Sequence, residues 1–206
     1  MNIHIKICGI TRLEDAFLAE ELGASAIGFV FYQRSPRYIV PERAGEISEK
    51  LGPFIGRVGV FVDEEPGTVT EIFREAHLTA VQLHGMEDPS YVNVLNRKGI
   101  PVIKAFRVGD DFDCGTLTGY DSGTFLLDTF EKGNCYGGTG KTFDWNKAVE
   151  CKKYGRIILA GGLNPSNVRD AITAVSPWAV DVSSGVEVKF GIKDPEKMRA
   201  FFDAVR

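Results

Sequence analysis

His4-Ile5-Lys6-Ile7-Cys8-Gly9-Ile10-Thr11 is the stretch that decides the fold, because it predicts a β-strand, a turn and the start of a helix in direct succession. Successive side chains of a strand point to opposite faces, so the isoleucines share one face while Lys6 and Cys8 lie on the other. A face that carries a lysine and a cysteine is expected to line the interior of a closed sheet, with Cys8 at its C-terminal rim. Thr11 and Glu14 fit a capping box for the helix that follows.

The composition is that of one globular domain. With 206 residues and 44% hydrophobic side chains the chain can bury one large core, and we expect a single domain over residues 1–206. A net charge of −4 argues against a nucleic-acid partner. No apolar stretch approaches the ~20 residues of a membrane helix, and the first residues are not those of a signal peptide. We therefore expect no membrane partner and a cytoplasmic location.

The four cysteines are Cys8, Cys114, Cys135 and Cys151. They show neither a CxxC pair nor the spacing of a zinc finger. Disulfide frameworks and structural zinc sites are recognised by such spacings. We therefore expect neither a disulfide framework nor a metal site.

Strand and helix patterns alternate strictly along the chain. Eight short β-branched or apolar runs are each separated by the length of one crossover. The runs end near Cys8, Phe31, Val62, His84, Phe106, Asp128, Ala160 and Ser183. Helical patterns cover residues 13–22, 42–51, 68–76, 89–98, 145–154, 165–175 and 195–205. Three helices are predicted to begin at an Asp-Pro or Asn-Pro pair, at positions 88, 164 and 194, whereas residues 107–122 predict a loop or a single turn.

Eight such units with parallel strands form either a closed (β/α)₈ TIM barrel or an open doubly wound sheet. The barrel is favoured because polar residues recur two positions before the predicted strand ends, on the face of the rim residues. They are Lys6, Gln82, Lys104 and Asp181. An open sheet would bury them among aliphatic side chains. Barrel closure makes the first and last strands neighbours, so Lys6 is expected to pair with Asp181 and to help lower the pKa of Cys8.

Glycine-rich turns follow the last two predicted strands, at residues 160–164 and 181–187. Glycines let a phosphate approach backbone N–H groups, and many barrels build a phosphate site from their seventh and eighth loops. Tight turning alone would explain either set of glycines. Because both turns occur together, we predict a phosphate site formed by Gly161, Gly162, Ser183 and Ser184.

A further glycine-rich segment, residues 137–142, superficially resembles a P-loop. That motif needs a glycine where the chain has Cys135, and it should directly follow a strand. We therefore do not expect nucleotide binding. Gly138 and Gly140 are predicted to lend backbone donors to the substrate, and a solvated loop is the alternative.

Cys8 and Asp128 are the candidate acid and base pair at the rim. The alternatives are that Cys8 is a small buried hydrophobe and that Asp128 only caps a turn. His84 either orients a ligand or satisfies a neighbouring carbonyl. Arg37 lies in a cluster with Arg34 beside a rim turn, which favours an anion contact over a solvated charge.

Motifs in order along nearly the whole chain resemble those of the phosphoribosylanthranilate isomerases, (β/α)₈ barrel enzymes of tryptophan biosynthesis. They are KICGIT (6–11), GFVF (28–31), SPR (35–37), GVFV (59–62), VQLHG (81–85), LD (127–128), GTGKTFDW (138–145), AGGL (160–163) and DVSSGVE (181–187). Residues 109–122 are the least similar to the family.

The resemblance implies an Amadori rearrangement of N-(5-phosphoribosyl)anthranilate to the 1-deoxyribulose phosphate. In it Asp128 is the general acid, Cys8 is the general base, and Arg37 faces the anthranilate carboxylate. Neither metal nor cofactor is required, and the chain is a monomer or a homodimer. The alternatives are another phosphate-binding barrel enzyme, such as an isomerase or an indole-forming synthase, and a non-catalytic sensor of a sugar phosphate.

Overall fold

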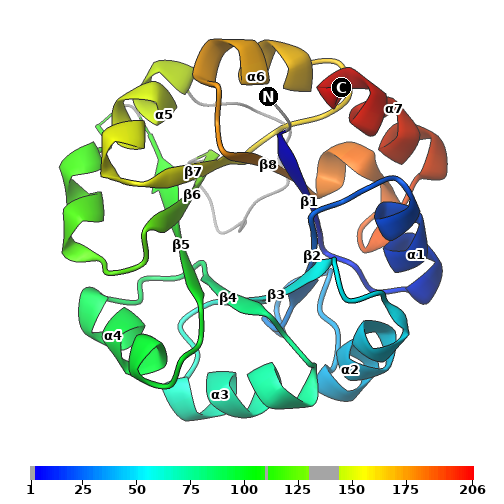
Figure 1. The fold of residues 1–206 in the computed structure, drawn as a ribbon, viewed down its shortest axis with the longest axis horizontal. Helices are drawn as coiled ribbons and strands as arrows, with labels where there is room; N and C mark the ends of the chain where they lie inside the picture. The colour runs from blue at the N-terminus through cyan, green and yellow to red at the C-terminus, as the bar shows by residue number, and fades with distance from the viewer. Residues whose placement is uncertain (1–2, 110, 130–143) are drawn as a thin grey trace.

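The computed structural model describes residues 3–109, 111–129 and 144–206, and within them eight parallel strands close into a barrel (Figure 1). The strands are β1 (His4–Cys8), β2 (Ala26–Val30), β3 (Gly56–Phe61), β4 (Ala80–Leu83), β5 (Val102–Val108), β6 (Thr124–Thr129), β7 (Arg156–Leu159) and β8 (Ala179–Val182). The first strand pairs with both β2 and β8, and Lys6 stands beside Asp181 in that register. The predicted (β/α)₈ barrel is confirmed.

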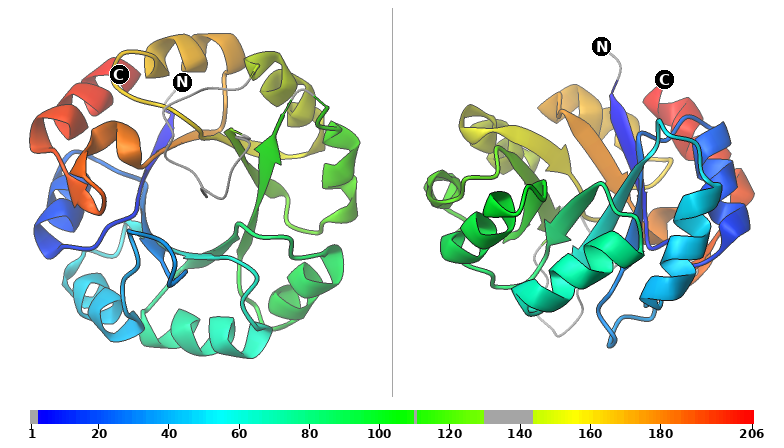
Figure 2. Two further views of the ribbon diagram at one scale, coloured as in Figure 1. Left: turned by 180° about the vertical axis from the view of Figure 1, so that it is seen from behind. Right: turned by 60° about the horizontal axis from the view of Figure 1, so that its bottom comes forward.

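Helices form a ring around the outside of the barrel, as both views of Figure 2 show. The α-helices are α1 (Leu13–Glu21), α2 (Pro41–Lys50), α3 (Pro66–Glu75), α4 (Pro89–Arg97), α5 (Trp145–Cys151), α6 (Val168–Val175) and α7 (Pro195–Val205). Short 3₁₀ helices are η1 (Cys114–Gly119), η2 (Lys152–Tyr154) and η3 (Ser184–Val186), and β9 (Glu187–Lys189) pairs with β10 (Ile192–Lys193) in a small hairpin after β8. In the described part of the chain, no helix is long and apolar enough to cross a membrane.

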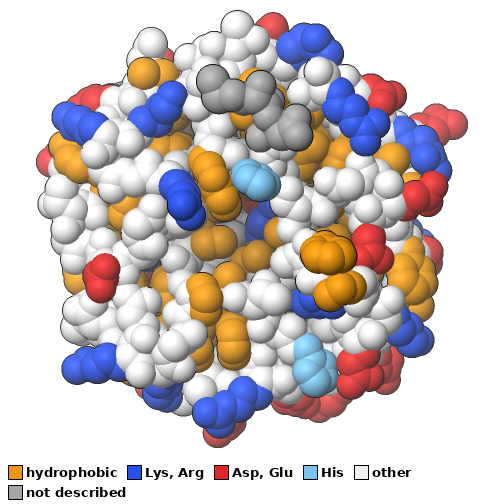
Figure 3. All heavy atoms as spheres, viewed as in Figure 1, with side chains coloured by type: hydrophobic (Ala, Val, Ile, Leu, Met, Phe, Trp, Pro, Cys, Tyr) orange, Lys and Arg blue, Asp and Glu red, His pale blue; other side chains and the backbone are white. Residues whose placement is uncertain are grey.

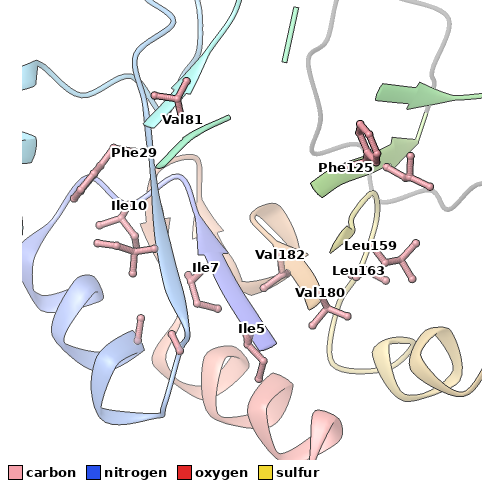
Figure 4. Packing of buried hydrophobic residues seen from close by; sticks show 14 of the residues in the cluster. Ile5, Ile7, Ile10, Phe29, Val81, Phe125, Leu159, Leu163, Val180 and Val182 are labelled. Carbon is pink, nitrogen blue, oxygen red and sulfur yellow. The ribbon is translucent and has the colours of Figure 1, made fainter. Parts of the chain in front are cut away.

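The largest core lies between the strands and the helix ring. Ile5 and Ile7 of β1 belong to it together with Val180 and Val182 of β8 (Figure 4). This is the face that the alternating isoleucines of the first strand predict. The opposite faces of the strands therefore line the barrel interior.

Two of the three predicted Pro-containing helix starts are confirmed. Asp88 accepts a hydrogen bond from the backbone N–H of Tyr91, and Asp194 caps α7 in the same way. The third prediction is wrong, because Asn164 only forms a local turn and α6 begins at Val168.

The predicted capping box at Thr11 is also wrong. Arg12 occupies the N-cap position of α1 and gives no side-chain cap. The Thr11 hydroxyl donates to the carbonyl oxygen of Gly191 in the hairpin after β8. A contact across the closed barrel thus replaces the local one.

The predicted orientation of β5 is wrong by one residue. Ala105 faces the barrel interior, where it packs with Leu126. Lys104 and Phe106 therefore point outward, and Phe106 packs edge-on against Tyr120. The charge of Lys104 is matched there by Glu87, whose Oε2 lies 2.8 Å from the lysine Nζ.

A disulfide joins Cys114 of η1 to Cys151 at the end of α5, which contradicts the expectation of no disulfide. The two cysteines are 37 residues apart, so no local spacing motif reveals the pair. Residues 107–122, predicted as loop or a single turn, contain η1, which this bridge attaches to the helix ring.

Candidate active site

A pocket opens at the C-terminal ends of the strands, where the sequence predicts the site. Its lining includes Cys8, Tyr32, Arg37, Gln82, His84, Asp128, Gly161, Gly162, Asp181, Ser183 and Ser184. All candidate site residues in the described ranges therefore meet around one cavity. Gly138 and Gly140, predicted to lend backbone donors, lie outside the described residues.

Cys8 and Asp128 reach this pocket from β1 and β6. Both side chains are largely withdrawn from solvent, with Cys8 8% and Asp128 6% exposed. Asp128 accepts a hydrogen bond from the backbone N–H of Thr129 through Oδ1, at 2.8 Å. That bond fixes the carboxyl group and leaves Oδ2 directed toward other groups of the pocket.

The Lys6–Asp181 pair is confirmed, with Nζ donating to Oδ1 over 2.8 Å in the barrel interior. Burial lowers the pKa of Lys6, but Asp181 and Cys8 together outweigh it and the pKa is raised, so Lys6 remains charged. The expectation for Cys8 is only partly right. Lys6 favours the thiolate, but burial is the larger effect and raises the pKa of Cys8 above its ordinary value.

His84 stands between Gln82 and the carboxyl group of Asp128. The Gln82 amide nitrogen lies 2.9 Å from His84 Nδ1. Nε2 lies 3.3 Å from Asp128 Oδ2 but without the alignment of a hydrogen bond. The imidazole thus faces the pocket beside the carboxyl group, which favours ligand orientation over a structural role.

Arg37 is held in the pocket by an acidic partner that the sequence did not reveal. Its Nε and Nη2 donate to Glu187 Oε1 and Oε2 over 2.9 and 2.8 Å. The stem of Arg37 lies over Gly9, where a Cβ atom would come within 2.6 Å of it. The guanidinium group is therefore fixed, and its Nη1 takes no part in the pair with Glu187.

The turns after β7 and β8 have the geometry of an anion site. Gly161 and Gly162 adopt φ values of +84° and +66°, a region that favours glycine. The hydroxyl of Ser183 is buried and has no hydrogen-bond partner among the described residues. A buried donor at the wall of a pocket is normally satisfied by a ligand or water.

Glu187 and Lys193 are functional candidates that the sequence did not single out. Both lie in the β9–β10 hairpin, and both are buried against the ends of β1 and β8. Glu187 stands within a motif that resembles the family, but its partner Arg37 is 150 residues away. Within the described ranges no cluster of side chains could hold a metal ion.

A closed barrel with a thiol, a carboxyl group and a phosphate-type turn at one rim defines an enzyme of proton transfer on a small phosphorylated molecule. The family model described as N-(5'phosphoribosyl)anthranilate (PRA) isomerase matches residues 5–204. The chain belongs to this family.

Curated relatives named N-(5'-phosphoribosyl)anthranilate isomerase are similar over almost their whole length. The protein of Citrifermentans bemidjiense is 50% identical over 195 residues, which cover 95% of this chain and 93% of the relative. That of Thermotoga neapolitana is 50% identical over 200 residues, covering 97% and 96%.

Solved structures of the family have the same fold. The phosphoribosyl anthranilate isomerase of Thermus thermophilus matches with a TM-score of 0.90 at 43% identity, covering 98% of each chain. A second isomerase, in complex with reduced 1-(o-carboxyphenylamino)-1-deoxyribulose 5-phosphate, matches with a TM-score of 0.88 at 44% identity, again covering 98% of each chain.

Proposed function

We propose that Cys8 and Asp128 are the general base and the general acid of the isomerisation that this chain catalyses in tryptophan biosynthesis. The reaction is the Amadori rearrangement of N-(5-phosphoribosyl)anthranilate to 1-(2-carboxyphenylamino)-1-deoxyribulose 5-phosphate. The observation that carries the proposal is the position of the two groups on β1 and β6, lining one pocket. A general acid and a general base at separate positions suit a reaction that protonates one atom and deprotonates another.

The carboxyl group of Asp128 gives its proton to the ribose ring oxygen. The bond from that oxygen to C1 breaks, and the lone pair of the anthranilate nitrogen forms an iminium at C1. The thiolate of Cys8 then takes the proton from C2, and the electrons of that bond form a C1–C2 double bond while nitrogen regains its lone pair. The resulting enolamine tautomerises to the ketone.

The remaining pocket residues bind and orient the substrate. We assign the phosphate to Gly161, Gly162, Ser183 and Ser184, because they offer backbone donors and an unpartnered hydroxyl. Arg37 faces the anthranilate carboxylate through the part of its guanidinium group that Glu187 does not use. The complex of a relative with a reduced phosphorylated ligand supports this substrate class.

Replacement of Cys8 by serine tests the assignment. The hydroxyl keeps the size but is a far weaker base, so kcat should fall by at least ~10²-fold while substrate affinity changes little. Turnover can be followed by the loss of anthranilate-adduct fluorescence, with Cys135→Ser as the matched control. Near-normal turnover by Cys8→Ser would refute the role of the thiol, and binding without turnover by the wild-type protein would favour the sensor alternative.

We infer that the chain forms a homodimer through the end of the barrel at which the strands begin. Hydrophobic side chains surround a hollow at the centre of this end (Figure 3), which is lined by Phe54 and Trp178 among others. Phe54 is 98% exposed, and Arg57 supports its loop by donating to the carbonyl oxygens of Leu51 and Gly52. One solved structure, 44% identical, is of monomers generated from the dimeric isomerase of Thermotoga maritima.

Sedimentation of a Phe54→Glu variant tests the dimer. A charge at the centre of an apolar interface should shift the protein to monomers. Met86 is 88% exposed but lies beside His84 near the opposite rim, so Met86→Glu is the matched control and should leave the dimer intact. A wild-type protein that sediments as a monomer would contradict the inference.

We place the enzyme in the cytoplasm, because its substrate is a charged phosphorylated intermediate of amino-acid biosynthesis. A disulfide such as Cys114–Cys151 is uncommon in that compartment. Alkylation of thiols in acid-quenched cell fractions, followed by mass spectrometry, would report both the compartment and the state of this cysteine pair. Recovery of the protein outside the cytoplasmic fraction would overturn the placement.

A further inference from the structure

The β9–β10 hairpin after the last barrel strand brings a buried lysine against the proposed base. The side chain of Lys193 has no solvent exposure. Its Nζ donates to the backbone carbonyl oxygen of Cys8 over 2.5 Å and to that of Ser183 over 3.2 Å. A third bond, of 2.9 Å, runs to Glu187 Oε1. Burial lowers the pKa of Lys193, while Glu187 opposes that shift. Three acceptors match the three N–H bonds of its ammonium group.

These bonds join the ends of β1 and β8, which carry the proposed base and the proposed phosphate site. Those strands are adjacent in the barrel but do not pair beyond Ile7 and Val182. Lys193 therefore links β1 and β8 beyond the point where their backbone hydrogen bonds end.

Two clusters of charged side chains lie beside Cys8. Lys6 stands below the thiol and is neutralised by Asp181. The second cluster consists of Glu187 and Lys193 of the hairpin together with Arg37, so it holds two cations but one anion. This cluster therefore carries one net positive charge on the hairpin side of Cys8.

His84 and Asp128 face Cys8 from the other side of the pocket. On the hairpin side, Arg37 and Lys193 share the single carboxylate of Glu187.

We propose that Lys193 is a positioning residue for Cys8, which holds the ends of β1 and β8 together and stabilises the thiolate with an uncompensated positive charge. The proposal rests on the proposed role of Cys8 for its catalytic meaning, but the effect on the thiol does not depend on turnover. The electrostatics agree. Burial raises the pKa of Cys8, Asp181 raises it further, and Lys6 and Lys193 lower it.

The pH dependence of the rate at which iodoacetamide alkylates Cys8 tests the proposal without substrate. A Cys135→Ser background, with Cys114 and Cys151 held in their disulfide, leaves Cys8 as the thiol observed. Lys193→Met removes the charge and all three bonds, whereas Lys193→Gln removes the charge but keeps a hydrogen-bond donor. Both should move the midpoint upward by about one pH unit, as expected for loss of one nearby charge.

Lys104→Met is the matched control, because Lys104 is also buried, also paired with a glutamate, and also bonded to two backbone carbonyl oxygens. It lies outside the barrel, so it should lower stability without moving the Cys8 midpoint. In the same variants of Lys193, the acidic limb of kcat/KM should follow the thiol midpoint upward, with kcat more affected than KM.

An unchanged Cys8 midpoint in a folded Lys193→Gln protein would overturn the proposal, as would an equal shift in Lys104→Met. Failure of the proposed function has a different signature. If Cys8 were not the base, Cys8→Ser would keep its activity while the thiol midpoint still moved in the Lys193 variants.

Discussion

The interior of the barrel changes character between its two ends. Toward the beginning of the strands it is apolar. The residues there are Ala105, Leu126, Ile158 and Ala179. Toward the ends of the strands it is polar, with Lys6, Cys8, Gln82, Asp128 and Asp181.

We call the apolar part near the beginning of the strands the lower layer and the polar part near their ends the upper layer. The same strands supply both layers, so position along the strand decides which kind of residue is tolerated. Polar groups can be buried in the upper layer because they satisfy one another, as Lys6 does with Asp181. The lower layer has no such partners and is apolar. We therefore expect changes in the upper layer to affect catalysis and changes in the lower layer to affect stability.

Asp128→Asn should break catalysis most strongly. The amide keeps the shape and can still accept from Thr129, but it cannot protonate the ring oxygen. We expect kcat to fall by ~10²–10⁴-fold, with the free energy of unfolding changed by about 1 kcal/mol or less. Steady-state kinetics and urea denaturation would measure the two effects. A kcat within about tenfold of wild type would contradict the role of Asp128.

Lys6→Met should be an exception to the division between layers, because it lies in the upper layer yet supports the fold. It leaves Asp181 buried without its partner, which costs about 3–5 kcal/mol of stability when one member of a buried pair is removed. Urea denaturation would measure the loss. The double variant Lys6→Met, Asp181→Leu removes both charges and should recover much of it; a double variant no more stable than the single one would contradict the explanation.

The Lys6–Asp181 pair also shows what the sequence can predict. Strand alternation and the closure of the barrel place the two residues side by side, and both rules act within one strand or between chain ends whose pairing the fold dictates. The rim residues Cys8, His84 and Asp128 were placed by the same rules. Only their distances and partners had to come from the structure.

The sequence failed where a distant partner overrides a local pattern. Lys104 was assigned to the interior because it lies two residues before the expected strand end at Phe106, whereas β5 runs on to Val108. Glu87, which matches its charge outside the barrel, belongs to another loop. Thr11 fits a local cap but donates to Gly191, 180 residues later. Lys193 and Glu187 remained unassigned for the same reason.

Leu126→Ala tests the lower layer of the barrel interior and should lower stability without lowering kcat. Leu126 is fully buried in the lower interior layer, and removing its side chain leaves a cavity that costs about 2–5 kcal/mol. Its apolar side chain takes no part in the proposed proton transfers, so kcat should stay near the wild-type value at temperatures where the variant is folded. Thermal denaturation and steady-state kinetics would measure both. A large loss of kcat with unchanged stability would show that the two layers are not separate.

Ser183→Ala should have the smallest effect, and one confined to binding. The Ser183 hydroxyl has no partner among the described residues, so the folded protein loses no internal hydrogen bond when it is removed. The bond to a charged phosphate would be worth about 1.5–3 kcal/mol. If the phosphate is held equally in substrate and transition state, KM rises by the corresponding factor while kcat is unchanged. Inhibition by inorganic phosphate should weaken in parallel, whereas a fall in kcat with KM unchanged would assign the hydroxyl to the chemistry instead.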